Sequence, residues 1–161
     1  MTAAERAADP QARLQRVLDL AYRQLGRRDR TVAELRRHLA AKAVEPRAID
    51  EAVAELTRQG YLNDARYARR YAEDRRALDD WGPERIERKL MAVGVEPELI
   101  ATALADRGGE DELSAAVALL RRRCREVPST DRERERALGL LVRKGYDLEL
   151  AYDAVRALTR A

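Results

Sequence analysis

Few side chains in this sequence have the types and spacing that catalysis requires. The chain holds a single histidine, His38, and a single cysteine, Cys124, and its eight glycines form no phosphate-binding loop. His38 has no partner at a metal-ligand spacing, and Cys124 continues an apolar helical stripe. Asp79 and Asp80 stand in a polar linker, where solvated turn residues are common. We therefore expect neither an enzyme nor a metal or cofactor site.

Arginine is the residue type that could instead bind a partner. Of the 32 basic residues, 29 are arginine, whose guanidinium group binds carboxylates and phosphates and stacks on flat groups. Many of these arginines form clusters that lie off the apolar stripes of the expected helices. The candidate partner- and DNA-binding residues are Arg36, Arg37, Arg69, Arg70, Arg75, Arg76, Arg85, Arg88, Lys89, Arg121, Arg122, Arg123 and Arg125.

A surface role is the usual explanation for any one of these arginines. Arginine near the C-terminus of a helix offsets the helix dipole, and pairs spaced by four residues, such as Glu84 and Arg88, are ordinary on helix surfaces. The sequence also repeats itself at a shift of 51 positions, and the clusters recur on helices that are equivalent under this shift. This recurrence favours a binding surface. The net charge is only +3, so no polybasic tail that would bind nucleic acid without structure is expected.

The composition argues against one thick hydrophobic core. The 161 residues are 38% charged and 4% aromatic, and alanine makes up much of the apolar fraction. The longest apolar run, 115–120, is too short to span a membrane, and the acidic residues Glu5 and Asp9 interrupt any signal-like start. We expect a soluble, cytoplasmic protein that does not enter a membrane, and the single cysteine agrees with a reducing compartment.

The sequence repeats itself at a shift of 51 positions. Leu35 then pairs with Ile86, and Leu39 pairs with Leu90. A second shift of 51 positions reaches Leu141 from Leu90, although this third copy matches the others only in outline. Self-similarity at such a period indicates a tandem array of one structural unit.

Each copy has the pattern of three helices. Capping boxes at 31–34 and 130–133 mark helix starts, as do Pro46, Pro83 and Pro97. No stretch alternates apolar and polar residues in the manner of a strand, so we predict an all-α protein of about nine helices. The predicted organisation is a flexible N-terminus at 1–10, followed by three-helix repeats at 11–60, 61–107 and 108–161.

A three-helix repeat of this size buries little apolar surface alone. Stacking each repeat against its neighbour hides more of that surface, so we expect an elongated, curved helical array. Gly108–Gly109 is the expected hinge before the third repeat.

Two stretches near the centre of the chain are specific in residue order as well as in helical period. The first is Gly60-Tyr61-Leu62-Asn63-Asp64-Ala65-Arg66-Tyr67-Ala68 followed by Tyr71, and the second is Trp81-Gly82-Pro83-Glu84-Arg85-Ile86 with Leu90 and Gly94-Val95. Together they resemble the signature of the RecX regulatory proteins, and Thr31-Val32-Ala33-Glu34-Leu35 is similar to the opening repeat of that family. Tyrosine stands at positions where many members carry phenylalanine.

The resemblance implies a non-enzymatic modulator of the RecA recombinase in DNA repair and the SOS response, and we expect the chain to be a monomer. Members are three tandem three-helix repeats that lie in the groove of the RecA filament on single-stranded DNA. They restrain filament growth, ATP hydrolysis, strand exchange and stimulated LexA cleavage. Our hypothesis is that the first and third repeats brace adjacent RecA subunits, whereas the middle repeat anchors the protein through Arg69, Arg70, Arg85, Arg88 and Lys89.

Two other classes of function remain open at this point. A three-helix repeat can be a helix-turn-helix, and residues 31–56 could supply its last two helices for direct DNA binding. That function predicts tight and steeply salt-dependent binding to bare DNA, whereas nearly balanced charge predicts weak binding. A helical scaffold without a nucleoprotein partner is the second alternative, and a pull-down with RecA filaments would distinguish it.

Overall fold

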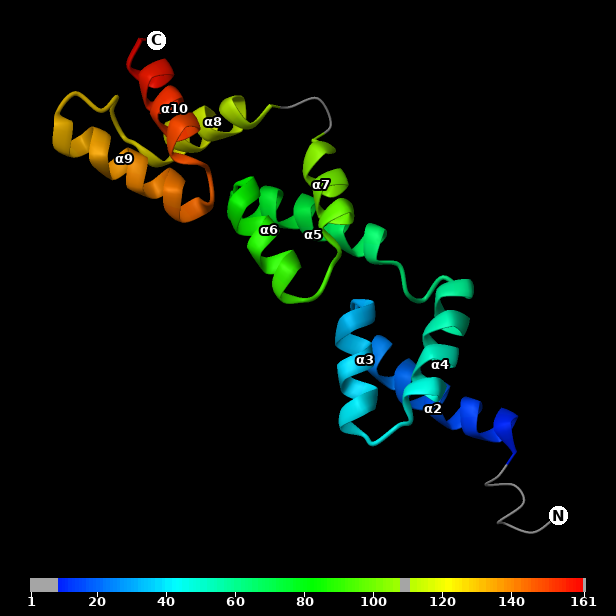
Figure 1. The fold of residues 1–161 in the computed structure, drawn as a ribbon. Coiled ribbons are helices and arrows are strands. Elements are labelled where there is room, and N and C mark those ends of the chain that lie inside the picture. The colour runs from blue at the N-terminus through cyan, green and yellow to red at the C-terminus, as the bar shows by residue number, and fades with distance from the viewer. Residues whose placement is uncertain (1–8, 108–110, 161) are drawn as a thin grey trace. The chain divides into compact units, whose positions relative to one another are not determined.

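The computed structural model describes residues 9–107 and 111–160, and every regular element in these ranges is an α-helix (Figure 1). This confirms the prediction of an all-α protein. The helices are α2 (Pro10–Leu25), α3 (Val32–Ala41), α4 (Pro46–Arg58), α5 (Asp64–Asp79), α6 (Pro83–Ala92), α7 (Pro97–Ala105), α8 (Glu112–Arg123), α9 (Asp131–Lys144) and α10 (Leu148–Arg160).

The described ranges contain no helix that combines the length and the apolar character needed to span a bilayer. Residues 1–8, which fall in the predicted flexible N-terminus, and the predicted hinge at Gly108–Gly109 lie outside the described residues. Within the predicted N-terminal segment, Asp9 caps α2 by accepting a hydrogen bond from the backbone N–H of Gln11 (3.1 Å).

The chain divides into two compact units. The first comprises α2, α3, α4, the first turn of α5 and residues 92–96, and the second comprises residues 68–91 together with the chain from Pro97 onward. Each unit is therefore described by itself. The helix α5 begins in the first unit and continues into the second.

The helices of the first unit pack their predicted apolar stripes together. Leu18 of α2, Leu35 and Leu39 of α3, and Ile49 and Leu56 of α4 all belong to one buried cluster. The third repeat has an equivalent cluster, to which α8, α9 and α10 all contribute. In both cases residues spaced by three or four positions place their side chains on the same face of the helix, so three amphipathic helices close around one small core.

The first helix of the middle repeat is buried through small side chains. Tyr67 and Tyr71, spaced by four residues on α5, are only half-buried. The fully buried residues of α5 are instead Ala68 and Ala72. Small side chains on this face let a neighbouring helix approach closely, while the tyrosine hydroxyl groups keep access to polar partners at the edge.

The helix ends follow the predicted signals. Thr31 and Glu34 form a reciprocal capping box at the start of α3, and Thr130 and Glu133 form another at the start of α9. Pro46, Pro83 and Pro97 are the first residues of α4, α6 and α7. The third repeat has Leu148 at the position of Pro97, and there the Asp147 carboxylate accepts from the Leu150 backbone N–H (2.9 Å). A side-chain cap thus replaces the proline.

The second helix of every repeat ends in the same left-handed turn. The residues with positive φ at this turn are Ala43 (59°), Gly94 (84°) and Gly145 (101°), each 51 positions from the next. After Ala43, the Val44 N–H donates to the carbonyl of Leu39, and the Tyr146 N–H donates to that of Leu141. These bonds satisfy carbonyl groups that the end of a helix leaves unpaired.

In the second unit, the turn at the end of α9 meets the start of α6. The Gly82 backbone N–H donates to the Lys144 carbonyl (2.7 Å), and the Glu84 N–H donates to the Gly145 carbonyl (2.9 Å). The free N–H groups of α6 are thus paired with the free carbonyl groups of α9. A Cβ added at Gly145 would lie 2.4 Å from the Cβ of Arg85, so the junction requires glycine there.

The first unit contains the same kind of contact. The Thr31 hydroxyl donates to the Val93 carbonyl (2.5 Å), at positions equivalent to Gly82 and Lys144 after the shift of 51. A Cβ at Gly94 would lie 2.4 Å from the Cβ of Ala33. Asn63 caps α5, whereas the adjacent Asp64 accepts from the Val32 N–H (3.0 Å).

Substituting Gly145 tests whether the close contact at this turn holds the second unit together. We expect Gly145→Ala to lower the free energy of unfolding by about 2 kcal/mol, because the new Cβ is strained at positive φ and clashes with α6. Ala43→Gly changes the equivalent turn where the side chain is exposed, and it should raise stability by about 1 kcal/mol. Chemical denaturation measures the free energy of unfolding of each variant. Equal changes in the two variants would contradict a stabilising contact between Gly145 and α6.

Candidate partner interface

Two of the predicted site arginines pack on the single tryptophan. Trp81 lies between α5 and α6, and the Arg85 guanidinium carbon stands 4.2 Å from the centre of the indole ring. The guanidinium carbon of Arg75 is 5.8 Å from the same ring, and the Tyr71 ring meets it edge-on at a centroid distance of 6.4 Å. Burial raises the pKa of the Tyr71 hydroxyl. The indole ring therefore packs against side chains of α5 and α6.

Both of these arginines also have polar partners inside the second unit. Arg85 donates to the Arg143 carbonyl at the end of α9 (3.0 Å), and Arg75 pairs with Asp79 (2.5 Å). Arg85 therefore adds a side-chain bond to the junction of α6 and α9, and its placement is explained by the fold.

Three more predicted site residues have intramolecular partners. Arg36 pairs with Asp50 across α3 and α4 (2.6 Å). Arg122 pairs with Asp80, whose carboxylate is thus bound rather than solvated as the sequence suggests. Arg76 is partly buried and donates to backbone carbonyl groups at the end of α7, which corresponds to a C-terminal cap. Burial lowers the pKa of Arg76, and the charge of nearby Arg107 acts in the same direction.

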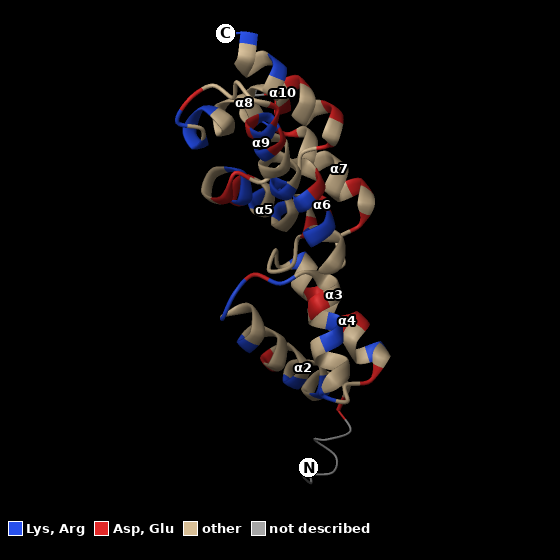
Figure 2. Ribbon diagram, turned by 90° about the vertical axis from the view of Figure 1, so that its left-hand side faces the viewer, with Lys and Arg blue, Asp and Glu red and all other residues tan. Residues whose placement is uncertain are grey.

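The remaining predicted cations are exposed, and they lie on α3, α5 and α6 and at or just after the end of α8. Figure 2 marks the positions of the Lys and Arg residues along the helices. Arg70 makes a further intramolecular interaction. The others make no hydrogen bond or ion pair with any residue in 9–107 or 111–160, so their charges are open to a partner. These available cations are Arg37, Arg69, Arg88, Lys89, Arg121, Arg123 and Arg125.

Arg88 contributes to a groove between α6 and α9 in the second unit. The groove holds about 670 Å³ and is lined by Arg88, Val142 and Arg143, together with Glu84 and Glu87. Within the described part of the chain, Arg88 and Glu84 form no ion pair, although their spacing allows one. Arg143 was not predicted, because it is not part of an arginine cluster.

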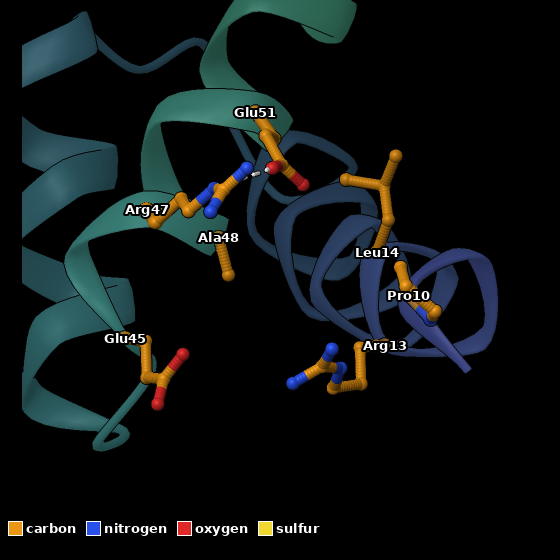
Figure 3. A pocket seen from close by; sticks show the side chains of 7 residues that line it. All are labelled: Pro10, Arg13, Leu14, Glu45, Arg47, Ala48 and Glu51. Carbon is orange, nitrogen blue, oxygen red and sulfur yellow. Dashed lines mark ion pairs between the residues drawn. The ribbon is translucent and has the colours of Figure 1, made fainter. Parts of the chain in front are cut away.

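The first unit has a separate hollow between α2 and α4 (Figure 3). Arg13 and Glu45 point toward it from opposite sides, and Arg47 pairs with Glu51 at its rim (3.4 Å). Its volume is about 240 Å³. Positive and negative side chains alternate around this hollow, so it has no net preference for an anion or a cation.

Metal-ligating side chains do not gather in the described ranges. No cluster of three or more histidine, cysteine or acidic residues forms there. Cys124 packs against the core of the third repeat, which confirms its interpretation as a small core residue. The positioned cations can bind carboxylates or phosphates, and this binding is the chemistry that the arrangement offers.

Comparison with known proteins connects this arrangement to one family. The family model described as RecX, first three-helix domain, matches residues 18–56, and that described as RecX, second three-helix domain, matches residues 63–104. The regulatory protein RecX of Stenotrophomonas maltophilia is 35% identical over 160 residues, covering 99% of this chain and 92% of the relative. That of Xanthomonas axonopodis pv. citri is 37% identical over 151 residues, covering 93% and 87%.

The fold agrees with a solved structure. The crystal structure of RecX from Lactobacillus salivarius matches with a TM-score of 0.80 at 20% identity, covering 92% of this chain and 98% of that chain. At this level of identity the match concerns the fold alone.

A pair of substitutions on α6 separates structural from available cations. Arg85→Ala should lower the free energy of unfolding by about 1–2 kcal/mol, because it removes the contact with Trp81 and the bond to Arg143. It should also change the fluorescence of Trp81. Arg88→Ala, three residues along the same helix, should stay within about 0.5 kcal/mol of the wild type. Equal losses of stability in the two variants, measured by thermal or chemical denaturation, would contradict the distinction between a structural Arg85 and an available Arg88.

Proposed function

Because the chain belongs to the RecX family of regulatory proteins, we propose that it binds the RecA recombinase filament on single-stranded DNA and lowers RecA activity. The activities affected are ATP hydrolysis, strand exchange and the stimulated cleavage of LexA. The protein acts by binding and not by catalysis, and it belongs to DNA repair and the SOS response.

The observation that carries this proposal is the set of available cations at repeated positions. Arg37 on α3 and Arg88 on α6 lie 51 positions apart, and both are exposed, with no hydrogen-bond or ion-pair partner among the described residues. Lys89 follows Arg88 on the same exposed part of α6. Placing the same charge on equivalent helices suits a partner that itself repeats, and a filament of identical subunits is such a partner.

The mixture of charges favours a nucleoprotein over bare DNA. Acidic residues accompany the cations on the helices, as Glu84 and Glu87 do beside Arg88. Carboxylates repel phosphates, but they complement the basic groups of a protein surface. Cations on the same helices can reach acidic side chains of the filament or phosphates of its DNA strand.

The helix-turn-helix alternative is weakened by the charge of the third helices. In such a motif the last helix lies in the major groove and benefits from positive charge. The helix α4 carries two arginines against three carboxylates. Both arginines, Arg47 and Arg58, pair with glutamates of their own helix. The equivalent helix α7 has no Lys or Arg at all.

The contacts of the middle repeat favour three of its cations as the proposed anchors. Arg85 already holds the junction with α9, so its charge is partly used within the fold. Arg69, Arg88 and Lys89 have no such contacts within 9–107 and 111–160, and we assign them the anchoring role. Arg37 in the first repeat and the cations at the end of α8 would then brace neighbouring RecA subunits.

Inhibition of the RecA ATPase on single-stranded DNA tests the function directly. Titrating this protein into the reaction should slow ATP hydrolysis in a dose-dependent manner, and the protein should co-sediment with the RecA filament. A helical scaffold of another kind would bind no filament and leave the rate unchanged. Tight binding to bare DNA with a steep salt dependence would instead support the helix-turn-helix alternative.

A triple variant tests the assigned anchors. Arg69→Ala, Arg88→Ala and Lys89→Ala together should raise the half-inhibitory concentration about tenfold, because charge-assisted contacts to the partner are lost. The matched control replaces Arg132, Arg136 and Arg160, which are equally exposed and carry the same total charge. The control should change the value less than about threefold. Equal weakening in both variants would refute the assignment, and circular dichroism would verify that both remain helical.

A further inference from the structure

A polar pocket of the second unit brings together three guanidinium groups. It lies between α5 and α8, holds about 370 Å³, and is lined by Arg76, Arg107 and Arg122. Arg107 was not predicted as a site residue, because it stands alone in the sequence. The three arginines are 31 and 15 positions apart along the chain, so only the fold places them around one space.

Alanines give this pocket its room. Ala77 of α5 and Ala115 and Ala118 of α8 line it with methyl groups, where longer side chains would fill the space. Trp81 and Tyr146 complete the wall. An opening of this size between two helices is large enough for a small polyatomic anion with its bound water.

The pocket carries an excess of positive charge. Asp80 is the single carboxylate among the lining residues, against the three arginines, and it pairs with Arg122. Glu112 forms an ion pair with Arg107 at 3.9 Å, and Arg107 has a further interaction within the chain. Bringing like charges into a partly desolvated space is unfavourable, so an anion bound among them would be stabilised.

The exposure of the arginines indicates how an anion would be held. The side chain of Arg122 is 56% exposed and uses one nitrogen for Asp80, so further N–H groups can turn toward a ligand. Arg107 is only 11% exposed and is therefore largely fixed in place. Arg76 is held by the carbonyl groups of α7 and supplies positive charge to the wall. A mobile guanidinium at the rim and two fixed ones behind it suit a tetrahedral oxyanion.

We infer that this pocket binds a phosphate group, with Arg122 and Arg107 as direct contacts and Arg76 as a fixed positive charge. The group can be free inorganic phosphate or the backbone of a single-stranded nucleic acid. Guanidinium donors match the oxygens of both. The inference concerns the chain without RecA, so it can fail while the proposed function stands.

Calorimetric titration of the full chain with inorganic phosphate tests the inference, at constant ionic strength with chloride as the reference anion. We expect saturable binding of phosphate and none of chloride. Trp81, the only tryptophan, lines the pocket, so its emission should change with the same dissociation constant. A parallel titration with a short single-stranded oligonucleotide identifies the source of the group. Absence of saturable binding of both phosphate and the oligonucleotide would overturn the inference.

Four variants locate the binding. Arg107→Gln should weaken it about tenfold through the loss of a charge-assisted contact, and Ala118→Leu should weaken it at unchanged charge by filling the space. Asp80→Asn removes the competing carboxylate and should tighten binding, and asparagine tolerates the positive φ of 57° at this position. The control Arg132→Gln, exposed on α9, should leave affinity unchanged. If Arg107→Gln and the control bind alike, or if Asp80→Asn weakens binding, the inferred pocket is wrong.

Discussion

The second unit depends on the end-to-end pairing of α6 with α9. Four N-terminal N–H groups of any helix lack partners, as do four C-terminal carbonyl groups, and burying them unpaired is costly. Here the Gly82 and Glu84 N–H groups meet the carbonyls of Lys144 and Gly145. The contact requires backbone to touch backbone, and this excludes a side chain at Gly145. A bundle with little apolar bulk thereby gains a junction made of hydrogen bonds.

This junction determines the roles of the arginines. Arg85 donates to the Arg143 carbonyl and stacks on Trp81, so its position is set by the joining of helices. Lys144 extends to the Asp79 carbonyl and closes the same region from the other side (2.7 Å). Arg88, one turn further along α6, makes no such contact with any residue that the structure describes. Neighbouring cations on one helix thus divide between holding the fold and facing solvent.

The sequence was sufficient to predict the elements but not the partners of their side chains. Helix starts depend on local signals, and the capping box of Thr31 and the proline at Pro97 acted as the sequence predicts. On α5 the tyrosine pair is only half-buried, and the buried residues are Ala68 and Ala72. Spacing alone does not distinguish the two pairs, because the residues of each pair are four apart and therefore share one face of the helix.

The candidate site was harder to predict, because a guanidinium side chain reaches partners far along the chain. The acceptor of Arg85 lies 58 residues away, and that of Arg122 lies 42 residues away. No local pattern shows that these two cations are occupied while Arg37 and Arg88 are not. The arginine clusters drew attention to the right helices, but Arg143 and Arg107, which line pockets of the second unit, are outside every cluster.

The most direct test of the available cations as the contact surface is lysine acetylation read by mass spectrometry, with and without RecA filaments on single-stranded DNA. The chain has three lysines. Exposed Lys89 should be modified rapidly in the free protein and be protected in the complex, whereas Lys144, bound to the Asp79 carbonyl, should react slowly in both states. An unchanged rate at Lys89 while the protein is bound to the filament would contradict the assignment of this surface.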